Sequence, residues 1–221
     1  MRILLFGMPG VGKGTQAKIL SSKLNIPHIS TGEILRQAVR DETELGKKAK
    51  EIMNEGELVP DSVMIGIIKE TFSQPRCKDG FILDGFPRTK IQAEELDELI
   101  DELKLSNVVV LSITAPVSEI LKRLTDRLAC KNCKSIFTRS KIEGLKSCPK
   151  CNAENSFYQR KDDTEDVIKN RIEIFNNVTK AVLEYYRDKR EVITIDGNDT
   201  VENVNKEILD TLSLKYDKIK N

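Results

Sequence analysis

One segment constrains the fold of this chain more than any other: a glycine-rich turn that directly follows an apolar run near the amino terminus. Residues 7–16 read Gly-Met-Pro-Gly-Val-Gly-Lys-Gly-Thr-Gln and lead into a helical pattern. Glycines permit positive-φ geometry, so successive backbone N–H groups can point at one anion, and the following helix N-terminus adds positive charge. Lys13 supplies a full charge that can reach the β and γ phosphates of a nucleotide. The turn therefore predicts a phosphate-binding loop between a strand and a helix.

The loop departs from the general phosphate-loop pattern at one position. The Gly-Lys pair is usually followed by Ser or Thr, whose hydroxyl ligates magnesium, but this chain has Gly14 there and Thr15 one residue later. We therefore do not expect a loop hydroxyl to ligate the metal directly. A glycine-rich turn with a solvated lysine is the alternative interpretation, and the position of the turn directly after a strand argues against it.

Short apolar runs alternate with longer amphipathic stretches along the chain. We expect strands at residues 2–6, 28–30, 80–83, 107–114 and 191–196. One helical face is predicted to carry Ile91, Leu96, Leu99, Ile100 and Leu103, and a second, longer helix is predicted to carry Ile168, Ile172, Phe175, Val182 and Tyr186 on one face. Because parallel strands need crossover helices, the alternation predicts an α/β fold, a three-layer arrangement with helices on both faces of a parallel sheet.

Two stretches interrupt this alternation. Residues 31–74 have helical pattern with little strand signal, and residues 129–158 are polar and rich in cysteine, lysine and asparagine. We interpret the first stretch as part of a helical subdomain and the second as a small insertion held together by a metal. The expected division is a core of residues 1–29, 60–126 and 161–221, a helical monophosphate-binding subdomain of residues 30–59, and a lid of residues 127–160.

The overall charge is balanced. The 221 residues include 36 Lys and Arg and 35 Asp and Glu, which gives a net charge of +1. This balance offers no general attraction to nucleic acid or to a membrane surface. No signal-peptide pattern is visible at the amino terminus, and the longest apolar run, residues 108–111, is too short to span a bilayer. We expect a monomeric cytoplasmic protein without nucleic-acid or membrane partners.

Four of the five cysteines have the spacing of a zinc ribbon. Cys130 and Cys133 form one C-x-x-C pair, and Cys148 and Cys151 form another after fourteen intervening residues. Four thiolates fill the tetrahedral positions of Zn²⁺, so the predicted metal is structural; iron is the alternative. Nearby lysines can offset the negative charge of the site. Cys77 stands apart, and we interpret it as a small core or loop residue.

Four motifs occur in order along nearly the whole chain. They are G-x-P-G-x-G-K-G-T-Q at residues 7–16, Ser-Thr-Gly-Glu at 30–33, Asp-Gly-Phe-Pro-Arg at 84–88 and Arg-Lys-Asp-Asp at 160–163. Together they resemble the adenylate kinase family, and the cysteine-bearing insertion is similar to the lid of its long-lid form. The resemblance implies reversible phosphoryl transfer from Mg-ATP to AMP that gives two ADP, with Mg²⁺ accompanying ATP and a structural Zn²⁺ in the lid.

The resemblance also implies the residues of each site. The phosphoryl-transfer residues would be Lys13, Asp84, Arg88, Arg123, Arg127, Arg160 and Arg171. ATP would be bound by Gly10, Val11, Gly12, Lys13, Gly14, Thr15, Arg127, Ser135, Ile136 and Asp199, the last three near the adenine. AMP would be bound by Thr31, Arg36, Glu57, Leu58, Val59, Gly85, Phe86, Pro87, Arg88, Gln92, Arg160 and Arg171.

Several of these residues have a second interpretation. Asp84 can hold magnesium through waters at the carboxyl edge of the sheet, or it can simply form the turn before a glycine. Gln92 can pair with adenine, or it can complete a capping box with Thr89; Ser30 and Glu33 have the same capping pattern. We expect Arg123 and Arg127, four residues apart, to project from one face of the helix that follows Pro116. Two acidic residues would hold the arginines or the lid hinge without direct chemistry, namely Asp162 and Asp163.

Three other functions fit parts of the sequence. Another nucleoside monophosphate kinase would use the same machinery with a different acceptor base. A zinc-ribbon nucleic-acid-binding protein would need a basic surface and stacking aromatics, whereas this chain has 7 Phe, 4 Tyr, no Trp and balanced charge. A catalytically silent nucleotide sensor would not need the full set of arginines. Turnover with different monophosphates separates these alternatives.

Overall fold

A five-stranded parallel sheet forms the centre of the molecule. A computed structural model describes the backbone of residues 1–220 and the side chains up to residue 214. The strands are ordered β2, β3, β1, β4, β8, and every neighbouring pair is parallel. Their bounds are β1 Arg2–Phe6, β2 His28–Ser30, β3 Phe81–Asp84, β4 Val108–Thr114 and β8 Val192–Asp196. Each strand lies within one residue of its predicted range, so the predicted sheet is confirmed.

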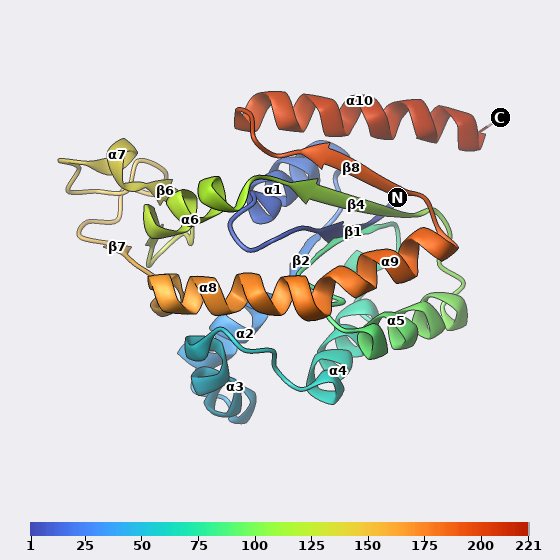
Figure 1. Cartoon of the computed structure of the whole chain (residues 1–221), viewed down its shortest axis with the longest axis horizontal. Coiled ribbons are helices and arrows are strands. Elements are labelled where there is room, and N and C mark those ends of the chain that lie inside the picture. Colours follow the sequence, from blue (N-terminus) through green and yellow to red (C-terminus); the bar gives the residue numbers. More distant parts are fainter. Residues whose placement is uncertain (221) are drawn as a thin grey trace.

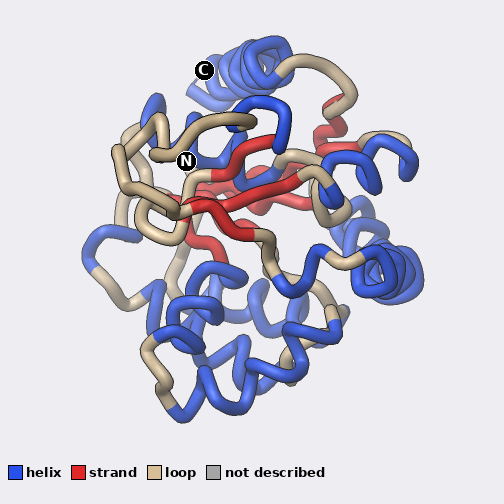
Figure 2. Tube along the Cα trace, turned by 90° about the vertical axis from the view of Figure 1, so that its left-hand side faces the viewer, coloured by secondary structure: helices blue, strands red, loops and turns tan. Residues whose placement is uncertain are grey.

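Helices cover both faces of this sheet, as Figures 1 and 2 show. The described helices are α1 Lys13–Leu24, α2 Thr31–Arg40, α3 Glu44–Glu55, α4 Asp61–Phe72, α5 Lys90–Glu102, α6 Val117–Thr125, α7 Arg139–Ile142, α8 Glu165–Ile174, α9 Lys180–Lys189 and α10 Val201–Lys220, with a 3₁₀ turn at Lys161–Asp163. In Figure 1, α1 and α10 lie on one side of the strands, and α5, α8 and α9 lie on the other. The α/β fold with three layers is therefore confirmed.

Successive side chains of a strand point to opposite faces of the sheet, and here they belong to two separate apolar clusters. On β1, Ile3 and Leu5 are buried in a cluster with residues of α1 and α10. Leu4 and Phe6 point to the opposite face, in a larger cluster with residues of α4, α5 and α9. The sheet is therefore buried on both faces, which explains why its strands read as continuous apolar runs rather than alternating ones.

The prediction of the apolar face of α5 is wrong for its first and last residues. Leu96, Leu99 and Ile100 are buried, but Ile91 is 58% exposed and Leu103 is 46% exposed. Ile91 lies five positions before Leu96, which places it about 140° around the helix from the buried stripe. The helix ends at Glu102, so Leu103 is the capping residue and turns away from the stripe.

The predicted longer helix contains a change of pitch. A π-helical turn, Phe175–Thr179, joins α8 to α9. Ile168 and Ile172, before the turn, pack with Ile120 and Leu124 of α6. The residues after the turn that the sequence assigned to the same face, Val182 and Tyr186, are buried instead in the cluster of α4, α5 and β1. The extra residue in the turn lets one long helical segment serve two different packing partners.

Two smaller parts extend from the sheet. Helices α2 and α3 form a flap and pack closely, because a Cβ placed on Gly46 would lie 2.0 Å from the Ala38 carbonyl oxygen. The cysteine-bearing segment forms a second, antiparallel sheet in the order β6, β5, β7, with β5 Arg127–Cys130, β6 Ile136–Thr138 and β7 Phe157–Tyr158. In Figure 1 this segment protrudes to the left. Sequence reasoning predicted a metal-held insertion here but not its strands.

No helix among the described residues has the length and apolar character that crossing a lipid bilayer requires.

Candidate active site and metal centre

The phosphate loop lies between β1 and α1, as predicted. Gly7 has φ 143°, and a Cβ there would lie 2.4 Å from the Ile113 carbonyl oxygen, so any side chain would collide with β4. Gly12, the residue before α1, has φ 110° with open space around it, so its backbone conformation rather than crowding requires glycine. The loop therefore holds its backbone N–H groups at the start of a helix, where an anion is favoured.

Lys13 closes this loop with its side chain. Its Nζ donates hydrogen bonds to the carbonyl oxygens of Gly7, at 2.7 Å, and Met8, at 2.9 Å. Burial lowers the pKa of Lys13 to about 8, although the nearby Asp84 carboxylate opposes this shift. A bound phosphate would add negative charge beside the ammonium, so the charged form of Lys13 gains most when an anion is present.

Asp84 is a buried carboxylate that faces the loop. It ends β3, opposite Leu5 of β1, and its Oδ2 would lie 3.5 Å from a Cβ at Gly14. Burial alone would raise the pKa of Asp84, but a hydrogen bond with His28 at 3.4 Å and the charges of Lys13 and Arg88 outweigh it and lower the pKa. The carboxylate is therefore ionised and lies beside the position from which the usual metal-binding hydroxyl is missing.

A pocket between the flap and the sheet has an empty volume of about 550 Å³. Of the residues predicted to bind AMP, it is lined by Thr31, Arg36, Glu57, Leu58, Val59, Gly85, Arg88, Gln92 and Arg171. A second pocket, of about 560 Å³, is lined by the phosphate-loop residues Gly7 and Lys13 together with Phe86, Pro87, Arg88 and Arg171. Arg88 and Arg171 line both pockets, so the two spaces adjoin at these guanidinium groups.

Gln92 forms a capping interaction and also lines the flap pocket. Thr89 Oγ1 accepts a hydrogen bond from the Gln92 N–H at 3.1 Å, so Thr89 caps this helix, but the Gln92 side chain does not return a bond to the Thr89 N–H as a full capping box requires. The side-chain amide is held at both ends: its oxygen accepts from the Arg88 N–H and its nitrogen donates to Asp61, each at 2.7 Å. These two partners fix the amide orientation.

The capping interpretation of Ser30 and Glu33 is wrong. The Ser30 side chain makes no cap hydrogen bond at the start of α2. Glu33 instead accepts hydrogen bonds from Arg36, at 2.7 Å, and from Arg160, at 3.0 Å. Burial would raise the pKa of Glu33, but the two guanidinium groups outweigh it and lower the pKa. Glu33 thus links the flap to the segment that follows the lid.

The predicted shared helical face of Arg123 and Arg127 is also wrong. Helix α6 ends at Thr125, and Arg127 is the first residue of β5. Arg127 pairs with the buried carboxylate of Asp163, whereas Arg123 donates to Glu119, at 3.0 Å, and to the Gly197 carbonyl oxygen, at 2.9 Å. The end of the helix therefore directs these two side chains to different partners.

Of the remaining arginines, Arg88 and Arg171 line the two pockets, and Arg160 lines neither but pairs with Glu33. Arg171 contacts Asp162 at 3.0 Å and Asp163 at 3.5 Å, and Arg88 donates to the Gly85 carbonyl oxygen at 2.8 Å. Burial, reinforced by the repulsion of neighbouring guanidinium groups, lowers the pKa values of Arg160 and Arg171 to about 10. This crowding of positive charge favours a ligand that carries several negative charges.

Residues predicted near the adenine lie on two separate elements. Ser135 is buried in the lid, and Ile136 of β6 is 39% exposed. Lys18 of α1 donates to the Lys134 carbonyl oxygen at 3.5 Å, so this part of the lid lies beside α1. Asp199 precedes α10, and its carboxylate accepts a hydrogen bond from Asn203 at 3.1 Å.

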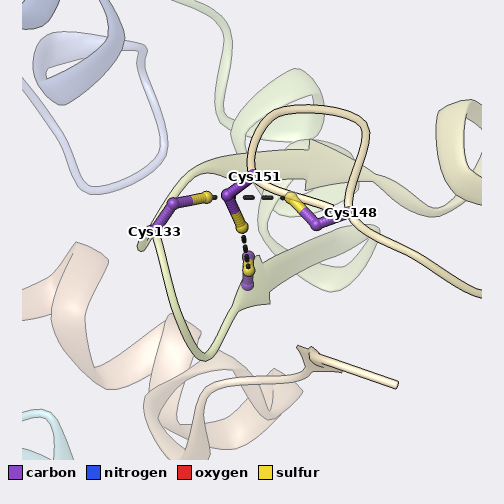
Figure 3. A group of neighbouring side chains, drawn as sticks. Cys133, Cys148 and Cys151 are labelled. Atoms are coloured by element: carbon purple, nitrogen blue, oxygen red, sulfur yellow. Dashed lines mark hydrogen bonds between the residues drawn. The ribbon is translucent and has the colours of Figure 1, made fainter. Parts of the chain in front are cut away.

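The four lid cysteines converge, as predicted. All four Sγ atoms lie within 4.8 Å of one another, and the pairs Cys130 with Cys151 and Cys133 with Cys148 are each separated by 3.7 Å. Figure 3 labels Cys133, Cys148 and Cys151 of this group. Tetrahedral Zn²⁺ with Zn–S bonds of about 2.3 Å requires sulfur atoms about 3.8 Å apart, so the geometry fits this metal. Cys77 is buried apart from the cluster, where its thiol contacts the Thr71 carbonyl oxygen, so its interpretation as a core residue is confirmed.

Hydrogen-bond donors surround these sulfur atoms. Burial would raise the pKa of Cys130, but the Ser156 hydroxyl and the backbone N–H groups of Cys133 and Asn132 outweigh it and lower the pKa to about 6. Asn132 also donates to Cys151 Sγ at 3.5 Å. At Cys130 the donors favour thiolate, which is the form that ligates a metal, whereas at Cys148 burial outweighs the nearby backbone N–H groups and raises the pKa to about 11.

Sequence reasoning missed three side chains of these sites. His28 contacts Asp84, Asp61 holds the Gln92 amide, and Glu33 joins Arg36 to Arg160. His28 is the single histidine of the chain, and its place in a strand beside β3 was the one available signal. The partners of Asp61 and Glu33 are distant in sequence, and no local pattern indicates them.

A phosphate loop on a parallel sheet, adjoining a second pocket through shared arginines, defines a P-loop phosphotransferase that acts on nucleotides. A family model described as adenylate kinase matches residues 5–191. The chain is 47% identical to an adenylate kinase of Archaeoglobus fulgidus over 210 residues, which cover 94% of this chain and 96% of the relative. It therefore belongs to the adenylate kinase family, and it is a phosphotransferase.

Two bacterial relatives show the same extent of similarity. The chain is 44% identical to an adenylate kinase of Acetivibrio thermocellus over 217 residues, with 96% of this chain and 98% of the relative covered. It is 42% identical to one of Staphylococcus epidermidis, also over 217 residues, with 96% and 99% covered.

Proposed function

We propose that this enzyme catalyses reversible phosphoryl transfer from Mg-ATP to AMP, which gives two ADP. The observation that carries the proposal is the sharing of Arg88 and Arg171 by the phosphate-loop pocket and the flap pocket. A donor phosphate in one pocket and an acceptor phosphate in the other would meet at these guanidinium groups. Positioned charge of this kind is the main requirement of phosphoryl transfer, because the protein forms no covalent bond itself.

The donor site in this proposal is the phosphate loop, Gly10 to Thr15, with Lys13 on the β and γ phosphates. Mg²⁺ would accompany ATP and would be held through waters by Asp84, because Gly14 offers no hydroxyl. Arg127 would complete the phosphate side, and Ser135, Ile136 and Asp199 would lie near the adenine. Arg123, whose guanidinium group contacts the loop at Gly197, would act on this side as well.

The acceptor site would be the flap pocket. Arg36 and Arg88 would bind the AMP phosphate, and the Gln92 amide would face the adenine, with Thr31, Glu57, Leu58, Val59, Gly85, Phe86 and Pro87 completing the walls. Arg160 and Arg171 would contact the acceptor or the transferring phosphate. Glu33 now holds Arg36 and Arg160, and a phosphate would compete with it for them.

The lid would exclude water from the donor site. We assign it residues 127–160, with the flap at 30–59 and the core at 1–29, 60–126 and 161–221. Zn²⁺ held by Cys130, Cys133, Cys148 and Cys151 would replace the apolar core that this small sheet lacks. Closing matters because water is a competing phosphoryl acceptor.

An acceptor panel tests the proposed substrate. Steady-state turnover would be measured with AMP, GMP, CMP and UMP at fixed Mg-ATP, and AMP is expected to give the highest kcat/KM. Equal or better turnover with another monophosphate would assign a different acceptor. No turnover with any of them, despite ATP binding, would indicate a nucleotide sensor instead.

A single substitution tests the phosphate loop. Lys13→Ala is expected to lower kcat by about 10³-fold, because it removes the charge aimed at the transferred phosphate. Circular dichroism should show an unchanged fold, and Lys47→Ala, at an exposed position of α3, serves as the matched control. We further propose a monomeric cytoplasmic enzyme without nucleic-acid or membrane partners. The balanced charge supports the absence of these two kinds of partner.

A further inference from the structure

A buried chain of polar side chains joins α1 to α10. Gln16 of α1 donates from Nε2 to the Val201 carbonyl oxygen at 2.9 Å, and its Oε1 accepts from Asn205 Nδ2 at 3.1 Å. Asn205 Oδ1 in turn accepts from Lys23 Nζ at 2.8 Å. Gln16 and Asn205 are each only 3% exposed, so two amides lie within an otherwise apolar contact between the helices.

This arrangement fixes the register of the two helices. Each amide uses its oxygen and its nitrogen, so neither is left without a partner. Apolar contacts such as Leu20 with Ile208 tolerate small sliding movements, because they are not directional. Buried hydrogen bonds do not, since a shift of about 1 Å would leave a desolvated amide without a partner.

The two helices begin at the two ends of the proposed donor site. Gln16 lies one turn after Lys13, on the helix whose N-terminus forms the phosphate loop. Val201 begins α10, directly after the loop of residues 197–200. That loop packs closely against the phosphate loop, because a Cβ on Gly197 would lie 3.1 Å from the Val11 carbonyl oxygen. Any displacement of α10 against α1 therefore moves residues 197–200 relative to the phosphate loop.

We propose that Gln16 and Asn205 are positioning residues that set the distance between the donor-phosphate loop and the donor-base loop. The inference rests on the proposed function in one respect, the location of the adenine near Asp199. Neither amide touches the nucleotide. They determine whether one ATP molecule can occupy both ends of its site at once, which is a requirement that a phosphate chain without a base does not have.

Calorimetric titration with two probes, ATP and inorganic tripolyphosphate, tests the proposal at one fixed magnesium concentration. Asn205→Leu retains the approximate side-chain volume but removes the amide that bonds Gln16 and Lys23. It is expected to weaken ATP binding by about tenfold and to leave tripolyphosphate binding within about twofold of the wild type. The KM for AMP should not change.

Leu212→Ala is the matched control. It removes buried apolar contacts two turns further along α10 without touching the polar chain, so it should lower the melting temperature but leave both affinities unchanged. Lys23→Met, which breaks only the outer link, should weaken ATP binding by less than Asn205→Leu. If Asn205→Leu does not fold, Asn205→Ser replaces it with the same expected direction.

The outcomes separate clearly. Unchanged ATP affinity in a folded Asn205→Leu variant overturns the inference, and so does an equal loss for ATP and tripolyphosphate, which would mean that the phosphate loop itself is disturbed. If the wild type binds ATP no better than tripolyphosphate, the assignment of the base site fails instead. Absence of AMP-dependent turnover in the wild type would reject the proposed function, whatever the polar chain between α1 and α10 does.

Discussion

Arg127 and Asp163 form a two-pronged ion pair at the base of the lid. Arg127 donates from Nε at 2.8 Å and from a terminal nitrogen at 2.5 Å to the two carboxylate oxygens of Asp163, which is fully buried. Arg171 approaches the same carboxylate at 3.5 Å. One acidic side chain therefore holds two of the guanidinium groups that the proposed mechanism directs at the phosphates.

Removing this carboxylate should affect both stability and activity. Asp163→Asn removes the counter-charge of Arg127 and one of the two carboxylates beside Arg171, which keeps Asp162 at 3.0 Å. We expect the free energy of unfolding to fall by about 3 kcal/mol, measured by urea denaturation. Turnover should fall as well, because the arginines lose their fixed orientation. Asp162→Asn, at a partly exposed carboxylate, should have a smaller effect. Wild-type stability in Asp163→Asn would contradict this reading of the pair.

ATP binding should weaken as pH rises above 8. The pKa of Lys13 is about 8 in the nucleotide-free protein, and bound phosphates must raise it. The protonated form therefore binds more tightly, so binding is strongest below pH 8 and weakens between pH 8 and the pKa of the complex. Calorimetry at pH 8.5 in buffers of different ionisation enthalpy should detect proton uptake on binding. No uptake at that pH would contradict the role given to Lys13.

Removing the lid metal should destabilise the protein. We expect one zinc per chain by elemental analysis and a melting temperature that falls by at least about 5 °C after chelation, because the lid has few buried apolar residues. Cys77→Ser should retain the metal, since this thiol lies outside the cluster. An unchanged melting curve after verified metal removal would rule out a structural role.

Gln92→Glu should not change the acceptor specificity of the enzyme from AMP to GMP. A carboxylate suits guanine better than an amide does, but here it would lie at hydrogen-bonding distance from Asp61 and repel it. We expect kcat/KM for AMP to fall by at least about tenfold without a gain for GMP. The double variant Asp61→Asn, Gln92→Glu relieves the repulsion and should recover stability. Efficient GMP turnover in the single variant would show that Asp61 does not restrict the pocket.

The sheet and the phosphate loop were predictable because their signals are local. Five apolar runs marked five buried parallel strands, and a single run of glycines with Lys13 marked the loop. The cysteine spacing likewise predicted the convergence of four sulfur atoms, because each C-x-x-C pair is itself a local unit.

The errors arose where structure depends on where an element ends or on partners distant in sequence. Arg127 was placed on a helix because neither glycine nor proline marks the end of α6 at Thr125. The lid strands were missed because their residues lack a clear apolar alternation and are held by the cysteine cluster instead. The pairing of Asp61 with Gln92 and of Glu33 with Arg160 joins residues 31 and 127 positions apart, which no sequence window contains.

The bond between Gln16 and Asn205 spans 189 positions of the chain, from the first helix to the last. During synthesis the phosphate loop leaves the ribosome well before the loop at residues 197–200 and α10 do. A growing chain therefore cannot assemble the full ATP site until α10 has been synthesised, and chains that stop before α10 are expected to bind ATP poorly.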